Sequence, residues 1–206
     1  MAAIVQLVTQ TLSVLTVSLH IGLVLSLFLN LIAWISKAKP GFFQKFIFFI
    51  KKNALAIAFI FALTATSGSL FFSEIAHYEP CKLCWFQRIF MYPQLILLGI
   101  ALWKKDSRIS RYIIPLSLIG GSISAYHYMI STFAKAAASG VCSAAGPSCV
   151  VEYFIQYGYI TIPMMALTAF FFIAVMAFLL KIKKEERAGG GKMVKIKKSK
   201  LIWSVA

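Results

Sequence analysis

The sequence predicts an all-α integral membrane protein with five transmembrane helices. Hydrophobic residues make up 60% of the 206 residues and charged residues only 13%, and the mean hydropathy is +0.83. A soluble domain carries about twice that charged share. A spanning helix needs about 20 apolar residues to cross a hydrocarbon core about 30 Å thick. Five stretches qualify or nearly qualify, near residues 4–35, 54–76, 86–103, 113–130 and 158–180.

The basic residues mark one side of the membrane. The net charge of +15 could suggest a nucleic-acid partner, but the 21 lysines and arginines follow the first, third and fifth stretches, with only Lys82, Arg88 and Lys135 elsewhere. Short cytoplasmic loops are enriched in Lys and Arg. We therefore expect no nucleic-acid partner, an N-terminus outside the cell and a C-terminus in the cytoplasm.

The chain divides into three segments at residues 53 and 180. Segment 1–53 holds the first stretch, which no basic residue precedes and which we expect to be retained rather than removed as a secretory signal. Its polar His20 and Asn30 are expected to face a neighbouring helix. A basic, phenylalanine-rich linker with a membrane-surface pattern completes this segment.

The other two segments hold the remaining stretches and a tail. Segment 54–180 contains four of the five stretches. Segment 181–206 is a basic tail with a flexible break expected at Gly189-Gly190-Gly191. Such a tail is expected to bind membrane lipid, through anionic head groups of the inner leaflet.

A C-x-x-C pair lies where an outward-facing turn becomes the third stretch. Pro80 precedes Cys81, and proline is favoured in the first turn of a helix. Cys81 and Cys84 are therefore expected near a helix N-terminus, whose partial positive charge stabilises a thiolate. Arg88 follows Cys84 by four residues and lies on the same face of a regular helix. The pattern predicts a reactive thiol of low pKa.

A second pair, Cys142 and Cys149, flanks Gly146-Pro147 in the longest external segment. Both pairs face outward in the predicted orientation, where disulfides persist. Four cysteines allow three pairings. Proximity in sequence favours disulfides 81–84 and 142–149 in a resting form, with exchange between the pairs as the chemistry.

Two structural alternatives compete with this redox interpretation. A zinc site of four cysteines usually has two closely spaced C-x-x-C pairs, and the second pair here has six intervening residues, so we expect no metal. A structural bridge within C-x-x-C constrains the unfolded chain little, because the loop is short. A non-enzymatic membrane adaptor with structural disulfides in its external loops stays open as the alternative function. An enzyme that delivers electrons outward is disfavoured, because no cysteine lies on the cytoplasmic side.

The stretch Cys81-Lys82-Leu83-Cys84-Trp85-Phe86-Gln87-Arg88 resembles the first cysteine motif of the disulfide bond formation protein B (DsbB) family. Cys142, Cys149 and Tyr126-His127-Tyr128 extend the resemblance, which covers roughly residues 54 to 180 and is closest to a short-loop variant. Here the C-x-x-C pair comes first in the sequence and the loop pair second. The vitamin K epoxide reductase relatives have the loop pair first, so the resemblance is not to them. The resemblance implies a four-helix transmembrane bundle core in a bacterial cell (inner) membrane, plus one additional N-terminal transmembrane helix.

The same resemblance implies an activity and its participants. It implies a membrane thiol oxidase that reoxidises a DsbA-like thioredoxin-fold thiol oxidase and passes the electrons to a quinone, ubiquinone or menaquinone. It implies catalytic roles for the four cysteines, with Cys142 bonded to the partner and Cys84 as the thiolate that faces the quinone ring. Arg88 is implied to polarise a quinone oxygen, and His127 is a candidate for a quinone or proton role.

Overall fold

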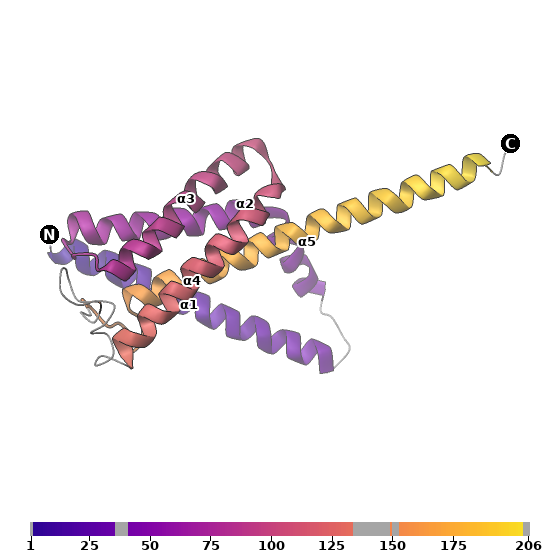
Figure 1. Cartoon of the computed structure of the whole chain (residues 1–206). Coiled ribbons are helices and arrows are strands. Elements are labelled where there is room, and N and C mark those ends of the chain that lie inside the picture. The colour runs from indigo at the N-terminus through magenta and orange to yellow at the C-terminus, as the bar shows by residue number, and fades with distance from the viewer. Residues whose placement is uncertain (1, 36–40, 134–148, 150–152, 204–206) are drawn as a thin grey trace.

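The computed structural model describes residues 2–35, 41–133, 149 and 153–203, and these residues form five long helices and no strand (Figure 1). The helices are α1 (Ala2–Ile35), α2 (Gly41–Leu70), α3 (Lys82–Lys104), α4 (Ser110–Thr132) and α5 (Ile162–Trp203). Each is long and apolar enough to cross a membrane. The predicted all-α integral membrane fold is confirmed.

Helices α2 to α5 pack into a bundle around a core of small and large apolar residues. Gly120 of α4 makes a close approach possible, because a Cβ at this position would clash with the ring of Phe170 on α5. Phe170 itself is only 1% exposed. The glycines of α4 thus serve helix packing.

A buried hydrogen bond joins α3 to α4 in the middle of the bundle. Ser117 Oγ donates to Gln94 Oε1 at 2.8 Å, and Gln94 Nε2 donates to the carbonyl oxygen of Phe90 at 2.9 Å. Both side chains are fully buried. Because apolar surroundings penalise an unpaired polar group, this bond fixes the rotation of α3 against α4.

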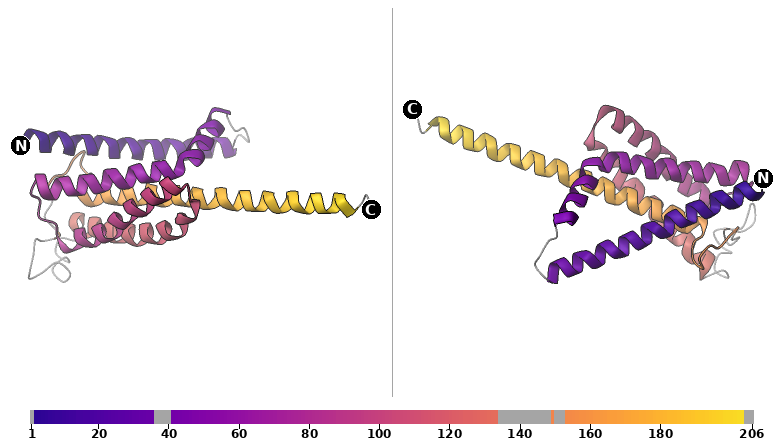
Figure 2. Two further views of the ribbon diagram at one scale, coloured as in Figure 1. Left: turned by 90° about the horizontal axis from the view of Figure 1, so that it is seen from above. Right: turned by 180° about the vertical axis from the view of Figure 1, so that it is seen from behind.

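Helix α1 lies on the outside of this bundle and leaves it towards its C-terminal end (Figure 2). Its inward face near the N-terminus carries the small hydroxyl residues Thr9, Ser13 and Thr16, all buried. His20 reaches α5, where its Nε2 lies 2.9 Å from Thr168 Oγ1, and its Nδ1 lies 3.2 Å from Oη of Tyr159 in the segment before α5. His20 therefore faces a neighbouring helix as expected, whereas Asn30 donates to the carbonyl oxygen of Ser26 in its own helix.

Three predicted boundaries are wrong. Helix α2 already begins at Gly41, so most of the expected linker before residue 54 is helical. Helix α5 begins at Ile162 and not at 158, because Gln156 and Ile160 exchange backbone hydrogen bonds around a turn in which Tyr157 and Gly158 have positive φ. Helix α5 also continues through Gly189–Gly191, where the sequence predicted a break.

The start of α3 and the N-terminal end of α1 lie at the same end of the bundle, and the C-terminal part of α5 projects from the other end (Figure 1). The first end also holds the π-helical turn η1 (Phe71–Ile75) and the segment 76–80. The short 3₁₀ helix η2 (Ser107–Ile109) joins α3 to α4 at the opposite end. The candidate site therefore sits at the N-terminal end of α3.

Candidate functional site

Cys81 and Cys84 sit at the first turn of α3, as the sequence predicted. Cys81 is the residue that precedes the helix, with extended φ and ψ of −70° and 171°, and its carbonyl oxygen accepts a hydrogen bond from the Trp85 backbone N–H. Both cysteines are free thiols, with their sulfur atoms 3.4 Å apart. The structure therefore describes this pair as a dithiol, and not as the disulfide expected for a resting form.

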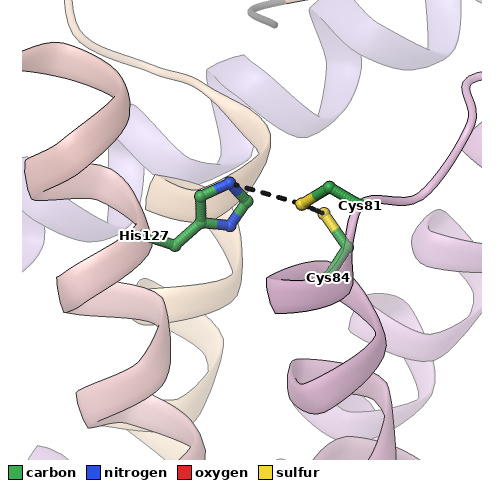
Figure 3. A group of neighbouring side chains, drawn as sticks. All are labelled: Cys81, Cys84 and His127. Carbon is green, nitrogen blue, oxygen red and sulfur yellow. Dashed lines mark hydrogen bonds between the residues drawn. The ribbon is translucent and has the colours of Figure 1, made fainter. Parts of the chain in front are cut away.

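His127 of α4 points at this pair from across the bundle (Figure 3). Its Nε2 lies 3.7 Å from Cys81 Sγ and 3.2 Å from the carbonyl oxygen of Cys149. Its Nδ1 lies 3.0 Å from the amide nitrogen of Gln87, which donates to it. A neutral imidazole that accepts at Nδ1 carries its proton on Nε2. His127 therefore presents an N–H to Cys81 and to the backbone of Cys149.

The pKa of the Cys81 thiol is lowered well below its ordinary value. The largest cause is the hydrogen bond with Cys84, and a hydrogen bond from His127 adds to it, while burial of Cys81 acts in the opposite direction. A lower pKa leaves more of this cysteine as the thiolate, which is the nucleophile in disulfide exchange. In the dithiol, the geometry favours Cys81 as the thiolate, whereas the resemblance implied Cys84 in that state.

Cys149 lies on the Cys81 side of the pair. It is disulfide-bonded and 2% exposed, and it packs in one apolar cluster with Cys81, Leu83 and Ile130. Cys81, Cys84, His127 and Cys149 line a small cavity of about 40 Å³. The structure thus brings one cysteine of the second pair next to the first pair, whereas Cys142 lies outside the described residues.

Arg88 lies on the other side of Cys84. Its Nε donates to Ser69 Oγ at 3.0 Å and its Nη2 donates to the Ser69 carbonyl oxygen at 3.1 Å, while its guanidinium lies over the Trp85 ring at 5.3 Å. Ser69 stands two residues before the π-helical turn η1. These contacts fix the arginine between α2 and α3.

A larger cavity of about 140 Å³ opens beside Arg88. Cys84, Arg88 and Gln87 supply polar groups on one wall, and most other lining residues are apolar. Cys84 lines both cavities, while Cys81 and His127 line only the smaller one. His127, which the sequence paired with Arg88 as a binding residue, is therefore separated from Arg88 by the cysteine pair.

An aromatic stack holds the chain that follows Cys149. The rings of Tyr78 and Tyr153 stack with centroids 4.3 Å apart, and Tyr153 Oη donates to the Glu79 carbonyl oxygen at 2.9 Å. Phe72 packs against both Tyr78 and Phe154. The segment before α5, from Tyr153 on, is thereby fixed to the segment before α3.

The donor atoms of Cys81, Cys84 and His127 all lie within 4.8 Å of one another, close enough to bind one metal ion. The sequence argument against a metal considered only cysteines, and it did not anticipate a histidine at this place. Two thiols and an imidazole are ligands that Zn²⁺ prefers. The same three groups also suit thiol exchange, so the expectation of a metal-free site stays a prediction.

Three residues of the site escaped sequence reasoning. Gln87 orients His127, Ser69 holds Arg88, and Tyr153 fixes the segment before α5 to Glu79. Only Gln87 had a usable signal, because it lies three residues after Cys84 and so shares a helical face with it. Ser69 and Tyr153 act through contacts between distant segments, which no local pattern reveals.

The chain is similar to proteins whose names refer to disulfide formation. The Bacillus cereus protein "Probable disulfide formation protein C 1" is 49% identical over 130 residues, which are 63% of this chain and 93% of that protein. The Bacillus subtilis "Disulfide bond formation protein C" is 42% identical over 132 residues, covering 64% and 95%, and the Oceanobacillus iheyensis "Probable disulfide formation protein" is 39% identical over 140 residues, covering 66% and 94%. No solved structure gives a significant match.

The family model described as "Disulfide bond formation protein DsbB" matches residues 51–182, which include α3, α4, both cysteine pairs, Arg88 and His127. This family supports a role in disulfide bond formation and an oxidoreductase activity. Helix α1 and the end of α5 lie outside the match. The chain belongs to the DsbB family of disulfide bond formation proteins.

Proposed function

We propose that this protein reoxidises a DsbA-like thioredoxin-fold thiol oxidase outside the cytoplasm and passes the electrons to a membrane quinone, ubiquinone or menaquinone. One observation supports this proposal above the others: Cys84 lies between two cavities. One cavity contains Cys81, His127 and Cys149, and the other is apolar and contains Arg88. A cysteine pair so placed can exchange with a disulfide on one side and reduce an apolar acceptor on the other.

The external pair Cys142 and Cys149 takes up the electrons first in this scheme. A thiolate of the reduced partner attacks Cys142, forms a mixed disulfide and releases Cys149 as a thiolate. The second thiol of the partner then releases Cys142. The partner leaves with a disulfide, and the external pair has gained two electrons and two protons.

The electrons then move from the external pair to the helix pair. The Cys149 thiolate attacks Cys81 of the 81–84 disulfide, and Cys84 leaves as a thiolate. Cys142 attacks Cys149, which restores the external disulfide and releases Cys81. The N–H of His127 Nε2, 3.7 Å from Cys81 Sγ, stabilises the departing Cys81 thiolate. While Cys81 is bonded to Cys149, Cys84 is the free thiolate. The role of Cys84 as the thiolate that faces the quinone is therefore compatible with the lowered pKa of Cys81 in the dithiol.

The larger cavity fits a quinone. Its volume of about 140 Å³ is close to the roughly 150 Å³ of a protein cavity that holds benzene. A guanidinium has five N–H donors, and Ser69 accepts from only two nitrogens of Arg88, so further donors are available for a quinone oxygen. Arg88 and Cys84 would hold the head group. When bound, the quinone takes up the two electrons and two protons of the 81–84 dithiol, which becomes a disulfide.

The orientation belongs to the same proposal. The N-terminal end of α1 lies at the cysteine end of the bundle, and the basic end of α5 lies at the opposite end (Figure 1). The distribution of Lys and Arg favours the cysteine end as the outer side. Outside the cytoplasm, disulfides persist and a soluble partner has access to the external pair.

The decisive experiment follows quinone absorbance under anaerobic conditions. Purified protein is mixed with a reduced thioredoxin-fold thiol oxidase and a soluble quinone, and we expect one quinone to be reduced for each partner disulfide formed. The Cys84→Ser variant, which cannot form the 81–84 disulfide, serves as the control and should consume no quinone. Absence of quinone reduction by the unmodified protein would leave the adaptor with structural disulfides as the better interpretation.

A further inference from the structure

The cavity beside Arg88 has a wall that the family match does not contain. Leu12, Leu15, Thr16 and Leu19 of α1 line this cavity together with Cys84 and Arg88. The match begins at residue 51, so α1 is an addition to the four-helix core. Without α1, the cavity would open towards the lipid on this side.

Two contacts fix α1 across the space between α2 and α5. A Cβ at Gly68 of α2 would lie 3.2 Å from Leu12 Cδ1, so the missing side chain lets α1 approach closely. Two turns further along, His20 bonds to Thr168 of α5 and to Tyr159. Thr168 already donates its hydroxyl proton to the Met164 carbonyl oxygen, so His20 Nε2 donates to Thr168 and Nδ1 accepts from Tyr159.

The residues between these two contacts face the cavity with apolar groups. Leu15 and Leu19 are aliphatic, and the Thr16 hydroxyl donates to the carbonyl oxygen of Leu12 at 2.8 Å within its own helix. The polar groups suited to a quinone ring lie on α3, at Cys84 and Arg88. The two walls therefore offer a polar and an apolar surface to one ligand.

We propose that α1 forms the outer wall of the acceptor cavity and binds the apolar tail of the quinone through Leu15 and Leu19. This inference rests on the proposed function and gives the additional helix a role in it. Binding of the tail would make affinity increase with tail length, because each further methylene that is buried adds to the hydrophobic contribution. A core without α1 would leave that tail in the lipid.

The test measures equilibrium binding to the oxidised protein, in which no electrons are transferred. Dissociation constants are determined by calorimetry for a quinone with a ten-carbon tail and for the same quinone without a tail. We expect Leu15→Ala with Leu19→Ala to weaken binding of the tailed quinone about tenfold and to change binding of the tail-less quinone little. Leu7→Ala is the matched control, because Leu7 is on the same helix and is exposed as Leu15 is, at 65% against 48%, but does not line the cavity.

A photoreactive group at the end of the tail provides a second measurement that does not depend on the stability of variants. Labelling of the unmodified protein should modify the tryptic peptide that ends at Lys37, which contains α1. Equal binding of the tailed quinone by the double variant and the Leu7 control, with labels only on other peptides, would overturn the role of α1. Absence of any quinone binding by the unmodified protein would instead overturn the proposed function.

Discussion

Gln87 and His127 form a buried pair in which the Gln87 amide nitrogen lies 3.0 Å from His127 Nδ1. This bond places the proton of a neutral His127 on Nε2, which faces Cys81 Sγ and the carbonyl oxygen of Cys149. One residue on α3 thus determines which histidine atom on α4 meets the sulfur. The effect of this pair on the pKa of Cys81 can be measured.

The first prediction concerns the pH dependence of Cys81 alkylation in the reduced protein. Because the pKa of Cys81 is lowered, its thiolate and its reaction with iodoacetamide should appear as pH rises through values below about 8.5, where an ordinary cysteine titrates. His127→Phe removes one of the causes, so the midpoint of the profile should move from the pKa of about 4 to higher pH, and alkylation at pH values near the original midpoint should slow. Mass spectrometry of tryptic peptides separates Cys81 from Cys84, because Lys82 lies between them.

Two further variants show whether the effect comes from this histidine and its orientation. Gln87→Leu should shift the profile in the same direction by less, because His127 remains but loses its donor. His77→Asn should leave the profile unchanged, because His77 is exposed and its positive φ of 54° suits asparagine. An unchanged profile in His127→Phe would show that Cys84 alone lowers the Cys81 pKa.

The second prediction concerns Arg88 and the acceptor. Arg88→Lys keeps the charge but loses the planar group that bonds twice to Ser69, so we expect quinone reduction to fall about tenfold with partner oxidation in a single turnover intact. Lys82→Ala is the matched control, since Lys82 is an exposed cation in the same helical turn as Cys84. If Arg88→Ala reduced quinone at the normal rate, Arg88 would only be an interfacial anchor.

Local patterns predicted the elements of the fold better than their limits. Long apolar stretches predicted the five spans, and Pro80 with C-x-x-C predicted the N-terminus of α3. The start of α2 at Gly41 was missed, because charged lysines interrupt the apolar pattern there although the backbone is already helical. Hydropathy reports the free-energy cost of moving a segment from water into the membrane. A helix can continue past the residue at which that cost changes.

The arrangement within the site depends on helix rotation, which the sequence does not reveal. The resemblance implied that Arg88 polarises a quinone oxygen and made His127 a candidate for a quinone or proton role, but no sequence pattern showed which way His127 points. Packing of Gly120 on Phe170 and the bond between Ser117 and Gln94 rotate α4 so that His127 meets Cys81. The depth of a residue in the membrane follows from counting residues along its helix. The direction in which its side chain points depends on contacts between helices.

The third prediction is that the cysteine site works without a metal ion. The donor atoms of Cys81, Cys84 and His127 could hold zinc in the dithiol form, but a 81–84 disulfide would remove both thiolates. We expect elemental analysis of the purified protein to give far less than one zinc per chain, and a chelator to leave quinone reduction unchanged. One tightly bound zinc per chain, lost together with activity on chelation, would contradict the exchange scheme.

The fourth prediction concerns orientation. In a background in which all four cysteines are replaced by serine, Ser139→Cys lies between α4 and α5 in sequence and Ser107→Cys lies in η2. A membrane-impermeant thiol reagent applied to intact cells should label the first variant and not the second. Labelling of both after the cells are opened controls for access, and the reverse pattern would place the cysteine pairs in the cytoplasm.

The last prediction concerns the order of electron transfer. The external pair should oxidise the partner before the helix pair takes part, so Cys84→Ser should abolish quinone reduction but still oxidise about one equivalent of partner. Cys142→Ser with Cys149→Ser should oxidise no partner. A partner whose second cysteine is replaced by serine should accumulate a covalent complex through Cys142 of the unmodified protein, because the thiol that releases Cys142 is missing.

The route between the pairs can be tested in the same series, because His127 Nε2 contacts both Cys81 Sγ and the carbonyl oxygen of Cys149. Cys142→Ser with Cys84→Ser leaves only Cys81 and Cys149, and mild oxidation should join them. Trypsin cuts after Lys82, so the linked peptide ends at Lys82 when Cys81 is bonded and begins at Leu83 when Cys84 is bonded. The matched variant Cys142→Ser with Cys81→Ser should form the 84–149 disulfide at least tenfold more slowly. Equal rates would mean that both cysteines reach Cys149, and catalytic oxidation by a protein without Cys142 and Cys149 would reverse the proposed order.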